Sequence, residues 1–157
     1  MVLDVVGPDQ TDGVKGCVFC GIVRGEIPAD VVLMDEAGVA FLDRRPLMPG
    51  HVLLVPHGHV ATLPDLPLEQ VGPFFRLSQR LARAVPLAMG AEGSFVAVNS
   101  VVSQSVPHLH VHVVPRRHDD RLFSRNLAWT RRPYRDDGER AATAEAIRAA
   151  LDETASR

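Results

Sequence analysis

The segment "QSVPHLHVHVVP", residues 104–115, decides the fold of this chain and points to its chemistry. Three histidines alternate in it with three aliphatic residues: His108, His110 and His112 with Leu109, Val111 and Val113. Successive side chains of a β-strand point to opposite faces of the sheet. We therefore predict a strand over Leu109–Val114 that carries imidazoles on one face and buries aliphatic side chains on the other.

Three interpretations of the histidine row are open at this point. Purely structural histidines would each need a hydrogen-bond partner and would repel one another when protonated. A catalytic zinc triad needs three rings around one ion, but alternate residues on a strand lie about 7 Å apart, so at most two could share a metal. In the third interpretation the rings have separate roles, because neutral imidazole attacks phosphorus and also serves as an acid near pH 7. Gln104 and Ser105 favour this interpretation, since both can donate hydrogen bonds to a phosphoryl oxygen.

The composition is that of one ordinary globular domain. The chain has 157 residues, of which 46% are hydrophobic and 23% are charged. Its net charge of -2 argues against non-specific nucleic-acid binding. Asp4 stands where a secretory signal would be basic, and no long apolar run follows, so we expect a cytoplasmic protein with no membrane or nucleic-acid partner. Seven arginines between Arg116 and Arg135 form either a solvated surface or a positive rim near an anionic substrate.

The remaining sequence predicts helices and short strands in one α+β domain. Residues 1–15 are expected to be a flexible tail. Hydrophobic patterns predict a short helix over residues 17–25, strands at 31–34, 39–42, 51–55 and 95–98, and a long helix over residues 68–85. Pro73 either kinks the long helix or marks its true start. Asp136 or Asp137 caps a final helix over residues 136–157. Short turns between neighbouring strands favour an antiparallel sheet.

Several segments together resemble the histidine triad (HIT) nucleotide-binding family. They are, in family order, Cys17-Val-Phe-Cys20-Gly-Ile, Gly25-Glu-Ile-Pro28, Ala40-Phe-Leu-Asp43, Pro49-Gly-His51-Val-Leu-Leu-Val-Pro56, Asn99, Gln104-Ser105-Val and His108-Leu-His110-Val-His112-Val-Val. The resemblance covers residues 17–135 and implies a HIT domain over residues 16–135. It implies an α+β meander with an antiparallel sheet of about five strands, one long helix and a short N-terminal helix. It also implies a homodimer.

The resemblance further implies cleavage at the α-phosphorus of a purine nucleotide, through a covalent nucleotidyl-histidine. His110 is then the nucleophile, His112 hydrogen-bonds the phosphate or the leaving group, and His51 lies behind them. Phosphate and leaving-group binding are implied for Gln104, Ser105 and Asn99. Asp43 corresponds to the acidic residue that receives the ribose hydroxyls. The implied apolar base pocket, for which core packing is the alternative, consists of Val18, Phe19, Ile22, Phe41 and Leu42.

The only two cysteines form a CxxC motif, Cys17 to Cys20. A redox role usually belongs to a βαβ context, which is not predicted here, and two inert thiols or half of a structural zinc site remain. The resemblance implies a structural zinc held by Cys17, Cys20, His59 and His108. His57 could replace His59, because the sequence Pro56-His-Gly-His59 offers both rings.

The sequence leaves three functions open. The first is a nucleotide hydrolase or nucleotidyl transferase that acts on a nucleoside phosphoramidate or a dinucleoside polyphosphate. The second is a nucleotide-binding adaptor with incidental hydrolysis, and the third is a metal hydrolase. Ser100-Val-Val-Ser103 departs from the glycine-rich sequence common in the family, and glycine lets a backbone approach a ligand closely. This loop therefore bears on which substrate is accepted.

Overall fold

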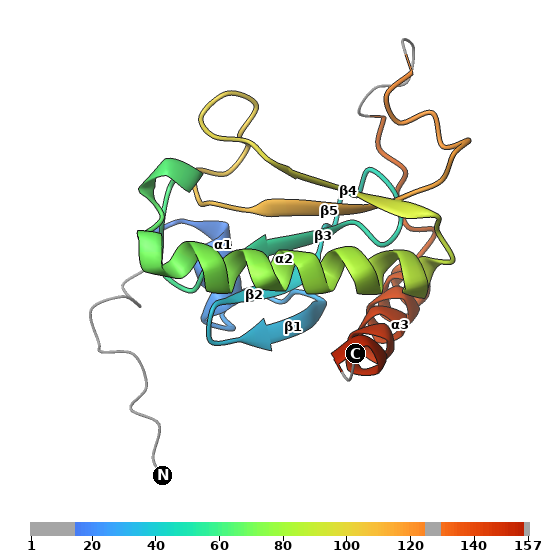
Figure 1. Ribbon diagram of the computed structural model, residues 1–157, viewed down its shortest axis with the longest axis horizontal. Coiled ribbons are helices and arrows are strands. Elements are labelled where there is room, and N and C mark those ends of the chain that lie inside the picture. Colours follow the sequence, from blue (N-terminus) through green and yellow to red (C-terminus); the bar gives the residue numbers. More distant parts are fainter. Residues whose placement is uncertain (1–14, 125–129, 156–157) are drawn as a thin grey trace.

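The computed structural model describes residues 15–124 and 130–155. Of the predicted flexible tail, only Lys15 lies within these residues. Three α-helices, one 3-10 helix and five strands follow one another in the described residues (Figure 1). Their bounds are α1 Val18–Val23, β1 Val31–Asp35, β2 Gly38–Leu42, β3 Val52–Val55, η1 Leu63–Asp65, α2 Leu68–Met89, β4 Gly93–Val98, β5 Val111–Arg116 and α3 Asp137–Ala155.

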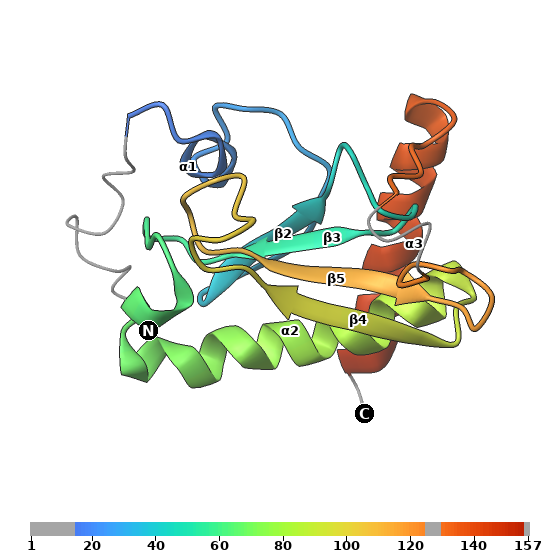
Figure 2. The ribbon, with the colours of Figure 1, turned by 90° about the horizontal axis from the view of Figure 1, so that it is seen from above.

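The five strands form one antiparallel sheet in the order β1-β2-β3-β5-β4. The first three strands follow one another through short turns, and α2 then carries the chain across the sheet to the edge strand β4 (Figures 1 and 2). The chain returns as β5, which pairs with β4 on one side and β3 on the other. The structure confirms the predicted α+β fold with a five-stranded antiparallel sheet.

The two faces of the sheet bury different clusters of side chains. Helix α2 lies along one face, where it packs with α3, and α1 lies on the opposite face (Figure 2). The α2 side contains the main core, to which β5 contributes Val111 and Val113. The α1 side contains a smaller cluster of Phe19, Val39, Phe41, Leu53 and Val55. All four residues of β3 are buried, because this central strand has both faces covered.

The prediction for the histidine strand was wrong in its bounds. Strand β5 begins at Val111 and not at Leu109, so His112 is the only one of the three histidines on it. The backbone N–H of Leu109 donates to Val60 O at 2.6 Å and that of His108 donates to Val106 O at 2.8 Å, so these groups bond to loops instead of a neighbouring strand. The predicted alternation nevertheless holds, because Leu109 packs in the main core with the two valines of β5.

Helix α2 contains Pro73 instead of starting at it. The helix begins at Leu68 and ends at Met89, and Pro86 also lies within it. Pro73 lacks the N–H that would bond the carbonyl of Glu69. Glu69 is exposed, so water can take the place of that donor.

Helix α3 starts as its capping residue predicts. The backbone N–H of Glu139 donates to Asp136 Oδ1 at 2.7 Å. Ala144, Ile147 and Leu151, spaced three and four residues apart on this helix, are buried in the main core. Within the part of the chain that the structure describes, no helix combines the length and the apolar character needed to cross a membrane.

Replacing Ile147 by alanine tests how firmly α3 is integrated into the core. The side chain is fully buried, and we expect Ile147→Ala to lower the free energy of unfolding by about 2–4 kcal/mol. The exposed substitution Ala149→Ser on the same helix is the control and should change it by less than about 0.5 kcal/mol. Urea denaturation measures both, and equal stability of the two variants would contradict the packing described.

Candidate active site

His110 is held in one orientation by the backbone that precedes it. Its Nδ1 lies 2.8 Å from the carbonyl oxygen of His108, so Nδ1 carries the proton and donates it to this acceptor. The ring is 2% exposed, and the edge of Phe19 packs against it at a centroid distance of 5.2 Å. Nε2 is therefore unprotonated when the ring is neutral, and its lone pair is available to an electrophile.

His112 is held by His51 and presents the opposite ring edge. The backbone N–H of Leu47 donates to His51 Nδ1 at 3.2 Å, which leaves the proton of a neutral His51 on Nε2. His51 Nε2 lies 3.0 Å from His112 Nδ1 and donates to it. The proton of a neutral His112 is then on Nε2. The ring centroids of His110 and His112 are 4.8 Å apart, so the lone pair of His110 lies beside the N–H donor of His112.

Burial keeps the rings of His51 and His112 neutral. Desolvation, followed by the charge of His112 and that of Arg131, lowers the pKa of His51 to about 3. Desolvation, followed by the charges of His110 and Arg131, lowers the pKa of His112 to about 4. At neutral pH the pair therefore offers dipoles and protons to a ligand without carrying a charge of its own.

A pocket of about 150 Å³ opens on the α1 side of the sheet. It contains every residue predicted for the base and ribose sites: Val18, Phe19, Ile22, Phe41, Leu42 and Asp43. Five further lining residues were not predicted: Ile27, Pro28, Ala29, Arg44 and Leu53. Two of these, Ile27 and Pro28, belong to the motif beginning at Gly25 that carries the family resemblance, so that motif is the sequence signal for this part of the pocket.

Asp43 lines the pocket and also lies next to His51, the partner of His112. Its Oδ1 accepts the backbone N–H of Arg45 at 2.8 Å, and its Oδ2 lies 3.5 Å from His51 Nδ1. Arg131 Nη1 is 3.7 Å from the same Oδ2 and also donates to the carbonyl of Arg45. Arg131 was known from the sequence only as one member of the arginine-rich segment.

Four other arginines of that segment make contacts away from the histidines. Arg116 pairs with Asp120, and Arg132 donates to the carbonyl of Asp120. Arg117 donates to the carbonyls of Met89 and Gly90 at the end of α2. Arg135 pairs with Glu139, and Arg125 lies outside the described residues. These four arginines therefore make surface contacts, as the first alternative expects, and Arg131 lies beside the site. The positive rim near an anionic substrate stays a prediction.

Gln104 makes loop contacts in this structure. Its Nε2 donates to Ala61 O at 2.6 Å, and its Oε1 accepts the backbone N–H of Val101 at 2.8 Å. The predicted role in phosphate binding therefore has only the second hydrogen of this amide to use. Of the other two residues predicted for phosphate binding, Ser105 is exposed and Asn99 is partly exposed next to the end of β4.

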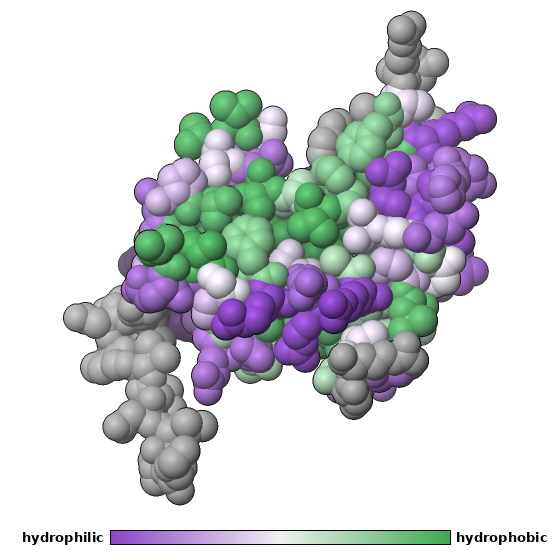
Figure 3. Space-filling view, viewed as in Figure 1, coloured by the Kyte–Doolittle hydropathy of each residue, from purple (hydrophilic) through white to green (hydrophobic). Residues whose placement is uncertain are grey.

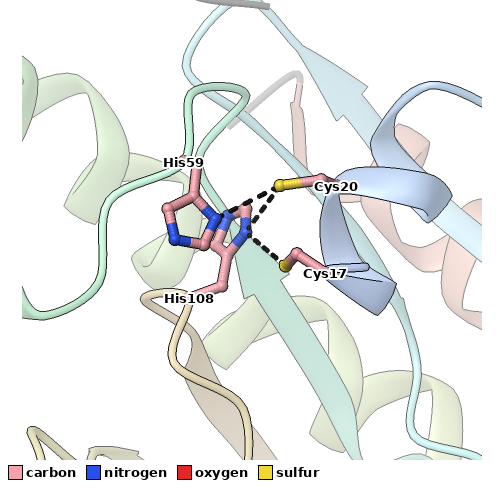
Figure 4. Close-up of side chains that lie close together, drawn as sticks. All are labelled: Cys17, Cys20, His59 and His108. Atoms are coloured by element: carbon pink, nitrogen blue, oxygen red, sulfur yellow. Dashed lines mark hydrogen bonds between the residues drawn. The ribbon is translucent and has the colours of Figure 1, made fainter. Parts of the chain in front are cut away.

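The CxxC motif and two histidines form a compact cluster (Figure 4). The ligand atoms of Cys17, Cys20, His59 and His108 all lie within 4.8 Å of one another. The Nδ1 of His108 is 3.5 Å from each sulfur, and the Nδ1 of His59 is 3.3 Å from the Cys20 sulfur. Tetrahedral zinc with Cys and His ligands places sulfur and nitrogen about 3.5 Å apart, so the four side chains fit such an ion.

The surroundings of His108 and His57 support the choice of Cys17, Cys20, His59 and His108 as the metal ligands. Desolvation lowers the pKa of His108 to about 4, which favours the unprotonated ring that a metal requires. Its Nε2 lies 3.3 Å from the carbonyl of Pro56, an outer partner of the kind that orients metal-bound histidines. His57 instead bonds to Asp35 O at 2.7 Å, so His59 is the histidine of this loop in the cluster. The triad histidines thus do not converge on one point, since His108 turns to the cysteines.

Comparison with known proteins assigns the chain to a family. A family profile described as the HIT domain matches residues 24–119. A HIT-like protein of Mycobacterium tuberculosis is 37% identical over 137 residues, which cover 86% of this chain and 92% of that protein. The chain therefore belongs to the HIT family.

A solved structure and a named enzyme add detail. The crystal structure of a zinc-bound histidine triad family protein from Mycobacterium smegmatis is 37% identical, with a TM-score of 0.76 over 90% of this chain and 96% of that one. The adenosine 5'-monophosphoramidase of Saccharomyces cerevisiae is 35% identical over 103 residues, which cover 64% of this chain and 63% of that protein.

The buried neutral His51 makes stability depend on pH in a defined direction. An unfolded histidine titrates near pH 6.5, whereas folded His51 has a pKa of about 3. Between these values the unfolded chain binds the proton and the folded chain does not, so the free energy of unfolding falls as the pH falls below about 6.5. In the variant His51→Gln, the glutamine amide is neutral at every pH and can accept from Leu47 and donate to His112.

We expect urea denaturation of the wild type and His51→Gln at pH 7.5, 6 and 5 to show that the free energy of unfolding falls more steeply with decreasing pH in the wild type. The difference in slope should approach about 1.4 kcal/mol per pH unit for one histidine. The cysteine–histidine cluster is the same in both proteins, so its own acid sensitivity cancels. Parallel pH profiles would show that His51 is not buried neutral.

Proposed function

We propose that the protein is a HIT-type nucleotide hydrolase or nucleotidyl transferase that cleaves a bond at the α-phosphorus through a nucleotidyl-His110 intermediate. The observation that carries this proposal is the bond from His110 Nδ1 to the His108 carbonyl, which leaves Nε2 as a buried lone pair beside the N–H of His112. A fixed nucleophile next to a donor for the phosphoryl oxygen is what attack on phosphorus requires.

The first step forms one bond and breaks one bond at phosphorus. The lone pair of His110 Nε2 bonds to the α-phosphorus, and the bond to the leaving group breaks with its electron pair. The negative charge of a bound phosphate favours the protonated form of His112, and a leaving nitrogen takes that proton. In the second step water bonds to phosphorus and gives a proton to His112, while the bond to Nε2 breaks and its electron pair returns to His110.

His51 supports either protonation state of its neighbour. Its Nδ1 faces a donor, the Leu47 N–H at 3.2 Å, and an acceptor, Asp43 Oδ2 at 3.5 Å. With His112 neutral, His51 accepts from Leu47 and donates from Nε2. With His112 protonated, His51 accepts at Nε2 and donates from Nδ1 to Asp43. The ring can therefore change its tautomer with small movements of its partners.

The pocket on the α1 side is the site proposed for the nucleoside. Its apolar lining suits a purine base, and Asp43 at its border suits the ribose hydroxyls. The yeast relative named as an adenosine 5'-monophosphoramidase supports a nucleoside phosphoramidate as substrate. A dinucleoside polyphosphate is the second substrate class, and a nucleotide-binding adaptor with incidental turnover is the alternative function.

Removing the His110 ring separates the enzyme from the adaptor. We expect His110→Ala to lower kcat for adenosine 5'-phosphoramidate by about 10³-fold or more, because the substitution removes the proposed nucleophile. Binding of adenosine monophosphate, measured by calorimetry, should remain. The exposed His118, which pairs with Glu92, supplies the control variant His118→Ala. If wild type binds the nucleotide but cleaves neither substrate class faster than His110→Ala, the protein is a binding protein.

We further propose that Cys17, Cys20, His59 and His108 hold a structural zinc ion. Four protein ligands leave no open position, and they come from the N-terminal end of α1, where Cys17 precedes the helix, from the loop after β3 and from the segment before β5. When bound, zinc supplies a cross-link between these segments. The zinc-bound relative from M. smegmatis supports this choice of metal.

Metal analysis of cysteine variants tests the zinc site. We expect about one zinc per chain in the wild type, and Cys17→Ser should lose the metal and lower Tm by roughly 10 °C because a bound metal stabilises the fold. His57→Ala is the matched control, since this nearby histidine points to Asp35, and it should keep the metal. Wild-type protein purified without metal, but with its fold and activity intact, would contradict the proposal.

A homodimer formed through β4 is also proposed. This strand is at the edge of the sheet, and no charged residue occurs between Gly93 and Val98 to protect the edge from pairing. Val96 is 41% exposed, and Figure 3 shows apolar side chains gathered on the surface around β4. Pairing of two β4 strands across a two-fold axis would cover this edge.

A further inference from the structure

The loop between β4 and the histidine segment holds two non-glycine residues in a conformation that favours glycine. Val101 has φ 68° and Ser103 has φ 61°. Left-handed backbone is rare for any side chain and is an outlier for a β-branched residue such as valine. The glycine-free sequence from Ser100 to Ser103 therefore keeps the shape that glycine would adopt, at the cost of backbone strain. Such strain is typically retained at functional sites.

The same loop presents apolar side chains to solvent on a fixed frame. Val101 is 76% exposed and Val102 is 78% exposed. The side chain of Gln104 fixes the loop by bonding the Val101 N–H and the Ala61 carbonyl. Figure 3 shows the tip of the loop as an apolar projection that stands apart from the main apolar surface. The tip is therefore held outward in a defined shape.

The loop starts and ends beside the proposed nucleophile. Val98, the last residue of β4, pairs with Val111, which directly follows His110. Val106, near the other end of the loop, packs against the cluster that contains Phe19. Figures 1 and 2 place the loop at the end of the sheet where β5 begins, on the same side as α1. A group bound at His110 and leaving away from the nucleoside pocket would meet this loop.

The charges near the loop disfavour an anionic leaving group. No Asp, Glu, Lys or Arg occurs between Gly93 and Pro115. The arginine-rich segment begins at Arg116, at the far end of β5, and Arg131 lies on the pocket side next to Asp43. A second nucleotide joined through several phosphates carries negative charges that need cations to replace water. The loop offers apolar surface instead.

We propose that Val101 and Val102 contact the leaving group and select nucleoside 5'-phosphoramidates whose amine is apolar. This inference rests on the proposed function and names the substrate class for it. A leaving amine with an aromatic or aliphatic substituent buries the exposed valines, whereas an unsubstituted amine cannot reach them. The strained backbone fixes the two side chains in place before the substrate binds, so binding costs little conformational entropy.

The test compares kcat/KM for three substrates. They are adenosine 5'-phosphoramidate, its 2-phenylethylamine amide and diadenosine tetraphosphate. For the wild type we expect the phenylethyl amide to be preferred over both others. Val101→Gly and Val102→Ser should each lower the ratio of the phenylethyl to the unsubstituted amide by about tenfold, the order expected for losing apolar contacts in a binding site. Val101→Gly should not lower Tm, because glycine adopts φ 68° without strain.

Met34→Ser controls for the loss of an exposed apolar side chain elsewhere, since Met34 is 64% exposed on β1 at the opposite edge of the sheet. It should leave the substrate ratio unchanged. Unchanged ratios in both loop variants, or a wild-type preference for diadenosine tetraphosphate, would overturn the inference while leaving the hydrolase intact. Loop variants that dissociate a dimer and lose both amides equally would also overturn it, because the valines would then contact a second copy. Failure of the proposed function would look different, because the wild type would then cleave none of the three substrates faster than His110→Ala.

Discussion

The hydrogen bond between the His108 carbonyl and His110 Nδ1 is the interaction on which the rest of the site depends. His108 contributes in two directions at once, because its ring faces the cysteines of the CxxC motif and its backbone fixes the neighbouring ring. A residue anchored by its side chain can hold its own carbonyl still. A metal bound by these side chains would therefore steady the His110 ring through the backbone of His108.

The second constraint is that two adjacent neutral rings must differ in tautomer. His110 bonds to an acceptor, the backbone carbonyl, and so keeps a lone pair on Nε2. His112 bonds to a donor, His51, and so keeps a proton on Nε2. Burial lowers the pKa of His51 to about 3 and that of His112 to about 4, so this pair is neutral at pH 7 and its hydrogen bonds fix where the His112 proton lies. A nucleophile and a proton donor can thus stand side by side on one short stretch of chain.

Alternation of apolar residues and the family motifs were enough to predict the sheet, the long helix, the four residues of the cysteine–histidine cluster and six of the eleven residues that line the pocket. The start of β5 could not be predicted because the backbone N–H groups before it bond outside the sheet. Leu109 donates to Val60, which is distant in sequence, and His108 donates to Val106, which lies in a loop. Arg131 was not singled out because its approach to Asp43 joins residues far apart in the chain. The left-handed backbone of Val101 was also hidden, since local propensity opposes it.

The tautomers of the histidine rings can be measured directly by nitrogen NMR of protein labelled with ¹⁵N-histidine at neutral pH. The account predicts that His110 is protonated on Nδ1 and bare on Nε2, and that His112 shows the reverse pattern. Substitution of each histidine in turn assigns the signals. A His110 ring protonated on Nε2 would contradict the account, because the lone pair that is proposed to attack phosphorus would not exist.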